Sequence, residues 1–346
     1  MNSRERMMLT LQHKEADHVP VYPLINSASR QTIGCNYEEW TKDADKCAES
    51  IIKATDLLDV DCICTLVDLS VEAADWGMKM IYYEDQAACP DHNDFFLKSE
   101  NDYETLPVIN PRETPRMSEM IRMTKTLVDA RGETKPIVAF VFGPLGILGM
   151  LRGHDYMFMD LIMYPEKVHK ALRTITDTLK EYCKALIEAG ADAIMFDTLF
   201  SSKTIMRKEM WDDFEGPYIE ELAQLVHDAG KMVMIHNCGD GIYFDVQIKR
   251  MHPELISFLY LPDDCESMEE LKEKYGHQTT LLGHIDPGEL MVTSKEDLIK
   301  QCKEQIDAYK KDGGFVLATG CEYPAQMDFE HAKTMVEVAK TYGKYE

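Results

Sequence analysis

The sequence has too few basic residues to balance its acidic ones. Its 346 residues include 37 Lys and Arg against 61 Asp and Glu, a formal net charge of −24. Nucleic acids and anionic membrane surfaces attract basic protein faces, so we expect neither as a partner. The excess of acidic residues likewise argues against a substrate with many carboxylates, unless basic side chains are clustered at the binding site.

Long hydrophobic runs are also missing. No stretch approaches the about 18 consecutive apolar residues that suggest a transmembrane helix. The charged start of the chain, Met1 to Arg6, lacks the apolar core and small-residue cleavage site of a secretory signal peptide. We therefore expect a cytoplasmic protein.

Cysteine, by contrast, is plentiful, with ten residues. In a reducing compartment most cysteines are small buried hydrophobic residues, and the exceptions are metal ligands or nucleophiles. Cys62 and Cys64 lie two apart in an apolar run, so both are expected on one buried face of a strand. No spacing suggests a ligand role for six others: Cys35, Cys47, Cys89, Cys183, Cys265 and Cys302.

The composition, 45 % hydrophobic and 28 % charged, is that of a globular protein. Short apolar runs alternate with long stretches of helical periodicity, which is typical of βα units. Eight such runs favour a closed (β/α)₈ barrel over an open sheet. The predicted strands are Val19–Ile25, Val60–Val67, Ile137–Phe142, Asp192–Phe196, Lys231–Ile235, Leu255–Leu261, Thr279–Leu282 and Phe315–Ala318.

Glycines end three of the predicted helices. These helices are Asp160–Ala189, Lys208–Ala229 and Lys295–Lys311. The chain has no linker rich in Pro, Gly or Ser, so residues 1–346 are expected to form a single domain. Residues 68–116 are irregular and contain four prolines, and we interpret them as an insertion after the second strand. The glycines between Gly143 and Gly149 lack the spacing of a phosphate loop and are interpreted as a turn near the barrel mouth.

In (β/α)₈ barrels the active-site residues follow the carboxyl ends of the strands. Three residues with metal-binding side chains occupy such positions: His236 and Cys238 after the fifth strand, and Cys321 after the eighth. One imidazole and two thiolates suit Zn²⁺ and leave a fourth coordination position open. The spacing alone also fits small buried side chains at the barrel rim.

Several segments resemble the uroporphyrinogen decarboxylase superfamily over nearly the whole chain. They are RERMMLTLQHKEADHVPVYPLI (4–25), FGPLGILGMLRG (142–153), EAGADAIMFDT (188–198), GHIDP (283–287) and GGFVLATGCEYP (313–324). Within the superfamily, the H-x-C pair with a late cysteine is similar to the zinc site of the methylcobalamin:coenzyme M methyltransferases and other corrinoid-dependent methyltransferases. The resemblance thus implies Zn²⁺ held by His236, Cys238 and Cys321.

The resemblance further implies a methyl transfer between a corrinoid and a thiol or small methylated molecule. The corrinoid is expected on a separate carrier protein, because the chain has no D-x-H-x-x-G motif. Asp197 and Glu322 are the candidate catalytic residues; Glu322 is also a candidate fourth zinc ligand or an N-cap of the last helix. The pocket for substrate or corrinoid is expected to include Asn26, Asn237, His284 and Asp286, with a structural histidine as the alternative for His284.

Two other functions remain open. One is a decarboxylase of the uroporphyrinogen type that uses Asp197 without a metal. In those enzymes an arginine-containing segment after the first strand binds substrate carboxylates, and the matching stretch here, Asn26 to Arg30, holds a single arginine. The other is a barrel without catalytic activity that binds a corrinoid or a partner protein.

Overall fold

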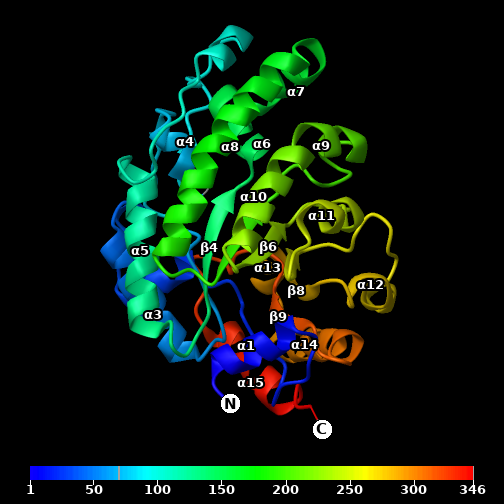
Figure 1. The fold of residues 1–346 in the computed structure, drawn as a ribbon. Helices are drawn as coiled ribbons and strands as arrows, with labels where there is room; N and C mark the ends of the chain where they lie inside the picture. The colour runs from blue at the N-terminus through cyan, green and yellow to red at the C-terminus, as the bar shows by residue number, and fades with distance from the viewer. Residues whose placement is uncertain (69–70, 346) are drawn as a thin grey trace.

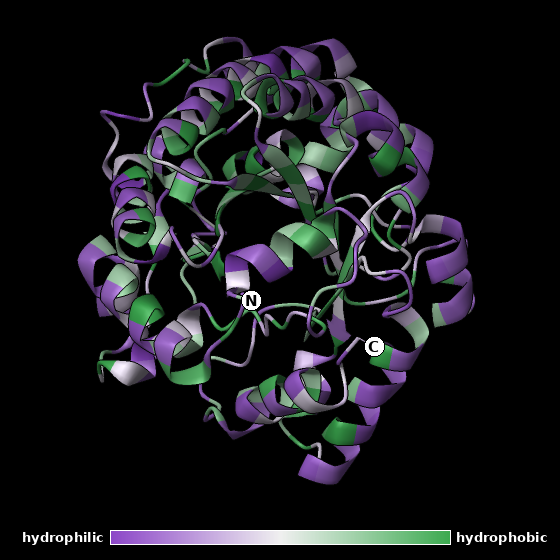
Figure 2. Cartoon of the chain, turned by 60° about the horizontal axis from the view of Figure 1, so that its bottom comes forward, coloured by the Kyte–Doolittle hydropathy of each residue, from purple (hydrophilic) through white to green (hydrophobic). Residues whose placement is uncertain are grey.

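Seven parallel strands form one curled sheet at the centre of the molecule (Figure 1). The computed structural model describes residues 1–68 and 71–345, and its sheet has the order β1-β4-β5-β6-β7-β8-β9. Helices surround the strands, as the view toward the bottom of Figure 1 shows (Figure 2). The predicted (β/α)₈ architecture is therefore confirmed. The strands are β1 (Ile63–Cys64), β4 (Ile137–Phe142), β5 (Ala193–Asp197), β6 (Met232–Asn237), β7 (Leu255–Phe258), β8 (Thr280–Ile285) and β9 (Phe315–Thr319).

The predicted first strand closes the barrel without forming a regular strand. Leu317 of β9 donates its N–H to the carbonyl of Pro20, and Tyr22 donates its N–H to the carbonyl of Leu317. On the other side, Asp61 donates its N–H to the carbonyl of Val21, just before β1. Pro20 and Pro23 have no N–H to donate, so a continuous ladder cannot form here. Only the bridge between Val21 and Leu317 remains of the predicted strand.

The helices that follow the strands form the outer layer. They are α5 (Pro115–Arg131), α6 (Pro144–Arg152), α7 (His154–Met163), α8 (Pro165–Glu188), α9 (Lys208–Phe214), α10 (Gly216–Asp228), α11 (Phe244–Met251), α12 (Met268–Tyr275), α13 (Pro287–Leu290), α14 (Lys295–Tyr309) and α15 (Glu330–Thr341). None in the described part of the chain is long and apolar enough to cross a membrane.

Two helices predicted as continuous are each broken in two. The predicted helix from Asp160 to Ala189 is interrupted at Tyr164, before Pro165, and the one from Lys208 to Ala229 at Glu215, before Pro217. Proline lacks the N–H of a helical hydrogen bond and is tolerated in the first turn. Each proline therefore starts a new helix.

The glycine-rich segment after β4 is a helix, not the predicted turn. All residues of α6 are buried, so the segment packs as part of the core. Gly143 precedes α6, and Glu215 accepts the N–H of Leu145 in its first turn at 3.1 Å. A carboxylate at this end stabilises the helix because the N-terminal N–H groups carry partial positive charge.

The N-terminal elements and the segment after β1 complete the chain. The former are α1 (Ser3–Leu11), η1 (Ser27–Thr32), α2 (Tyr37–Thr41) and α3 (Ala44–Leu58). The latter contains α4 (Val71–Asp75), the antiparallel pair β2 (Met80–Ile81) and β3 (Cys89–Pro90), and η2 (Glu100–Glu104). Residues 69, 70 and 346, which belong to the predicted domain and insertion, lie outside the described residues.

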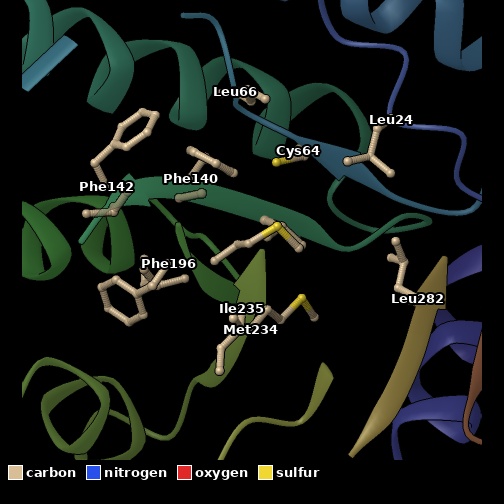
Figure 3. Close-up of a cluster of buried hydrophobic side chains, with 14 of the residues drawn as sticks. Leu24, Cys64, Leu66, Phe140, Phe142, Phe196, Met234, Ile235 and Leu282 are labelled. Atoms are coloured by element: carbon tan, nitrogen blue, oxygen red, sulfur yellow. The ribbon is translucent and has the colours of Figure 1, made fainter. Parts of the chain in front are cut away.

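Apolar side chains from separate segments fill the barrel interior. Leu24, Cys64, Phe140 and Leu282 belong to the same buried cluster (Figure 3). Cys62 and Cys64 are buried, as their spacing predicted. Because the strand ends stand on this packed core, side chains at the rim are held by a rigid scaffold.

Barrel closure should depend on the ion pair between Arg6 of α1 and Asp61. The guanidinium lies 2.6 Å from Asp61, whose other oxygen accepts the Val21 N–H at 2.8 Å. We expect Arg6→Met to lower the free energy of unfolding by about 3 kcal/mol, because it leaves Asp61 buried without a counter-ion. Lys53→Met, which breaks an exposed pair with Glu49, should cost less than about 1 kcal/mol. Urea denaturation measures both values, and equal losses would contradict this role.

Candidate functional site

The carboxyl ends of β5, β6 and β9 carry the predicted chemical groups. Asp197 is the last residue of β5 and pairs in register with His236 of β6. Cys238 directly follows β6, and Cys321 lies two residues beyond β9. The side chains thus stand at one rim of the barrel, as the topology requires.

His236, Cys238 and Cys321 come together although they lie on strands three places apart. Their ligand atoms all lie within 4.8 Å of one another, and Cys321 Sγ is 3.7 Å from His236 Nε2. Tetrahedral ligands at ordinary Zn–N and Zn–S bond lengths are about 3.5–3.8 Å apart. The donor set and its spacing therefore fit a zinc ion.

The pKa shifts of His236, Cys238 and Cys321 indicate which proton a bound metal ion would displace. A hydrogen bond from Cys321 lowers the pKa of Cys238, while that bond and burial raise the pKa of Cys321. Burial acts to lower the pKa of His236, but the thiol of Cys321 outweighs it and raises the pKa. Cys238 is therefore the more acidic of the two thiols, and a cation bound between the sulfurs would have to displace the proton of Cys321.

Ser257 of β7 orients the imidazole and was not found by the sequence analysis. Its Oγ lies 3.0 Å from His236 Nδ1. If Nδ1 carries the proton and donates it to Ser257, the unprotonated Nε2 faces the two thiols, which is the state that binds a metal. The only available signal was a single hydroxyl in the apolar strand Leu255–Phe258.

The backbone around the two cysteines is shaped by Asn237 and Gly320. Asn237 Nδ2 donates to the carbonyl of Thr198 at 2.6 Å, and its Oδ1 accepts the N–H of Gly239 at 2.8 Å. The amide thus holds the turn that contains Cys238. A Cβ at Gly320 would lie 2.6 Å from the Leu259 Cα, so only glycine lets the segment bearing Cys321 approach this closely.

Asp197 lies beside the cysteines and histidine as a buried carboxyl. Burial raises its pKa to about 6, against the opposing charge of His236. Its side chain has no hydrogen bond to another described residue. A carboxyl of this kind can hold or release a proton near neutral pH.

Glu322 connects the segment that bears Cys321 to Ser27, and Asn26, which precedes Ser27, bonds back to Tyr22. Glu322 Oε1 accepts the N–H of Ser27 at 2.7 Å, and burial raises its pKa. It does not cap the last helix, because α15 begins at Glu330. Asn26 Oδ1 accepts the hydroxyl of Tyr22 at 2.9 Å, while its buried Nδ2 has no partner among the described residues.

His284 and Asp286 are not brought together with the three ligands. His284 Nε2 lies 3.2 Å from the hydroxyl of Tyr309 in α14, and burial lowers its pKa to about 4. The ring therefore sits between the barrel wall and the outer helix. Asp286 caps α13, accepting the N–H of Gly288 at 2.7 Å.

Known proteins share this architecture. A sequence model described as uroporphyrinogen decarboxylase (URO-D) matches residues 2–342. The methylcobamide:CoM methyltransferase MtbA of Methanosarcina mazei is 21 % identical, over 98 % of both chains. The uroporphyrinogen decarboxylase of Myxococcus xanthus is 24 % identical, over 98 % of this chain and 97 % of its own. A solved methyltransferase from Methanosarcina mazei has a TM-score of 0.85 at 18 % identity and 99 % coverage of each chain.

The three-ligand cluster predicts a metal stoichiometry. We expect the reduced protein to bind about one Zn²⁺ per chain. Cys238→Ala and Cys321→Ala should each weaken binding by more than about 100-fold, because each removes a direct ligand. Cys89→Ala, which removes another half-buried free thiol, is the matched control. Competition with a chromophoric chelator measures the affinities, and wild-type affinity in either ligand variant would rule out this site.

Proposed function

We propose, from the premise that the chain belongs to the uroporphyrinogen decarboxylase (URO-D) family, that it is a zinc-dependent methyltransferase linked to a corrinoid. The observation that carries this proposal is the cluster of His236, Cys238 and Cys321. A decarboxylase of the uroporphyrinogen type, which would use Asp197 without a metal, has no need of these three ligands. The methyltransferase names of the MtbA relatives point in the same direction.

The residues around the cluster indicate what chemistry a bound zinc ion would supply. Zinc held by two thiolates and one neutral imidazole would be a Lewis acid with an open position, able to lower the pKa of a bound thiol or polarise a methylated heteroatom. Ser257 keeps His236 in the required orientation. The charge of Asp197 acts on both His236 and Cys238, and this supports Asp197 as the group that would accept the proton that a substrate thiol loses.

The methyl group would travel to or from a corrinoid, which supplies the cobalt atom and is carried by a partner protein. The barrel rim that bears the cluster is where such a carrier would meet the substrate. We place the reaction in the cytoplasm, because ligand thiols must stay reduced and all ten cysteines are free.

Arg30 suggests what kind of small molecule binds beside the metal. Arg30 is only 5 % exposed and forms no ion pair with a described residue. The guanidinium lies 5.5 Å from the ring centre of Tyr37, and its buried Nε has no hydrogen-bond partner. Arg30 and His236 both act on the charge of Glu322. A buried cation that has no direct ion pair and carries an unsatisfied N–H is costly unless a ligand completes its contacts.

We therefore propose a thiol or methylated substrate with one anionic group, which Arg30 binds. The unpaired Nδ2 of Asn26 is a second donor on the same segment. A single arginine matches a single sulfonate or carboxylate. It matches less well a tetrapyrrole with many carboxylates, so this segment favours methyl transfer over uroporphyrinogen decarboxylation.

Methyl transfer is tested with methylcobalamin and simple thiols. We expect the zinc-loaded protein to consume methylcobalamin in the presence of 2-mercaptoethanesulfonate, followed by the visible spectrum. Cys238→Ala and Cys321→Ala should lower the rate by more than about 100-fold, because the Lewis acid is lost. Full activity after complete zinc removal would refute the proposal, as would chelator-insensitive release of carbon dioxide from uroporphyrinogen.

The role of Arg30 is tested by comparing a charged and a neutral thiol. Arg30→Met should raise the KM for 2-mercaptoethanesulfonate by about tenfold or more, the value of a hydrogen bond to a charged group. The KM for 2-mercaptoethanol should change by less than about twofold, and Arg30→Lys should restore part of the loss. Arg122→Met, which breaks an exposed pair with Asp45, is the control. Equal effects on both thiols would contradict this role.

A further inference from the structure

A cavity whose lining includes none of the three ligand residues lies between the segment after β1 and helices α6 and α7. Its volume is about 210 Å³. An apolar protein cavity of about 150 Å³ holds a benzene molecule, so this one has room for a somewhat larger ring. The lining residues are Ala88, Cys89, Pro90, His92, Phe95, Gly149, Met150, His154 and Leu199.

Aromatic rings frame the cavity. His92 meets Phe95 edge to face with ring centres 5.9 Å apart. His154, another lining residue, meets Phe200 behind it edge to face with ring centres 5.6 Å apart. Edge and face contacts of this kind are the ones a flat ring makes with its neighbours.

Two glycines let these rings approach the helices. A Cβ at Gly149 would lie 2.7 Å from Cδ2 of His154, and one at Gly153 would lie 2.5 Å from Cε2 of Phe95. Gly153 also has a φ of +86°, which side chains rarely adopt. The backbone between α6 and α7 is therefore shaped to place His154 and Phe95 at the cavity.

The cavity offers hydrogen bonds but no charge. None of its lining residues is an Asp, Glu, Lys or Arg. Burial and the neighbouring His92 lower the pKa of His154, so His154 is neutral near pH 7. Neither imidazole forms a hydrogen bond with another described residue. The neutral ring of His154 therefore has one N–H donor and one N acceptor free for a ligand, and the ring nitrogens of His92 are also open to a ligand.

We propose that this cavity binds a flat, uncharged aromatic or heteroaromatic ring that hydrogen-bonds to His92 or His154. The ligand is one or two fused rings in size, and an ionised ring is disfavoured because the lining has no Asp, Glu, Lys or Arg to pair with its charge. Leu199 follows Asp197 by two residues, so the bound ring lies beside the barrel mouth. The site does not depend on a metal or on the proposed methyl transfer.

Calorimetric titration of the full chain tests this site. Benzimidazole is the probe, because it is flat, neutral at pH 7.5 and carries both a donor and an acceptor. We expect it to bind with a stoichiometry of about one and at least about tenfold more tightly than benzoate, which has a similar size but a negative charge. Equal affinities, or no binding up to about 10 mM benzimidazole, would overturn the proposal.

Two variants locate the binding. Leu199→Trp should fill the cavity and weaken benzimidazole binding by at least about tenfold, whereas Leu225→Trp, at a half-buried leucine of α10, should leave it unchanged. His154→Phe preserves the ring but removes its nitrogens, so it should weaken benzimidazole binding and spare toluene binding. Wild-type affinity for benzimidazole in both Leu199→Trp and His154→Phe would place the ligand elsewhere and overturn the proposal.

Discussion

Closure of the barrel between β9 and β1, through the irregular segment around Val21, is the constraint on which the rest of the structure depends. Asp61 is 1 % exposed and accepts both a guanidinium N–H of Arg6 and the backbone N–H of Val21. One carboxylate thus joins α1, the irregular segment around Val21 and the start of β1. Because prolines prevent a full ladder here, side-chain bonds replace the missing backbone bonds. The cost of burying these charges is offset only while every partner is present.

The three-ligand cluster is a consequence of that closure. Strands β6 and β9 are separated by β7 and β8, and strands three places apart in a flat sheet would be about 14 Å apart. In the barrel the ligand atoms lie within 4.8 Å. The curl of the sheet and the close passage of Gly320 past Leu259 both accompany this approach.

Charge is distributed unevenly in this acidic chain. Surface carboxylates account for most of the formal charge of −24, while the rim holds Asp197 and Glu322 with raised pKa values. Beside them stands one buried arginine without an ion-pair partner among the described residues. A single cation in such surroundings selects for the number of negative charges in a ligand, because each further carboxylate would remain uncompensated. The cavity between the segment after β1 and helices α6 and α7 has no Asp, Glu, Lys or Arg in its lining, and we expect it to favour uncharged ligands.

The sequence by itself determined the barrel and the identity of the three possible metal ligands. Alternation of apolar runs and helical stretches depends only on local periodicity, and residues after strand ends must gather at one rim in any barrel of parallel strands. The same local reasoning failed where packing decides. It took α6 for a turn, because glycines that serve close packing resemble turn glycines, and it treated prolines as compatible with continuous helices.

Only the tertiary structure decided which polar side chains face one another. His284 follows the same strand-end rule as His236, yet its ring lies against Tyr309 on the outside of the barrel. Ser257 gave almost no signal in its apolar strand, yet it holds the imidazole of His236. Side chains alternate across a strand, and a shift of one residue in the strand boundary reverses the face. Sequence periodicity locates a strand to within a few residues, and the orientation of a side chain requires the register that only the folded barrel supplies.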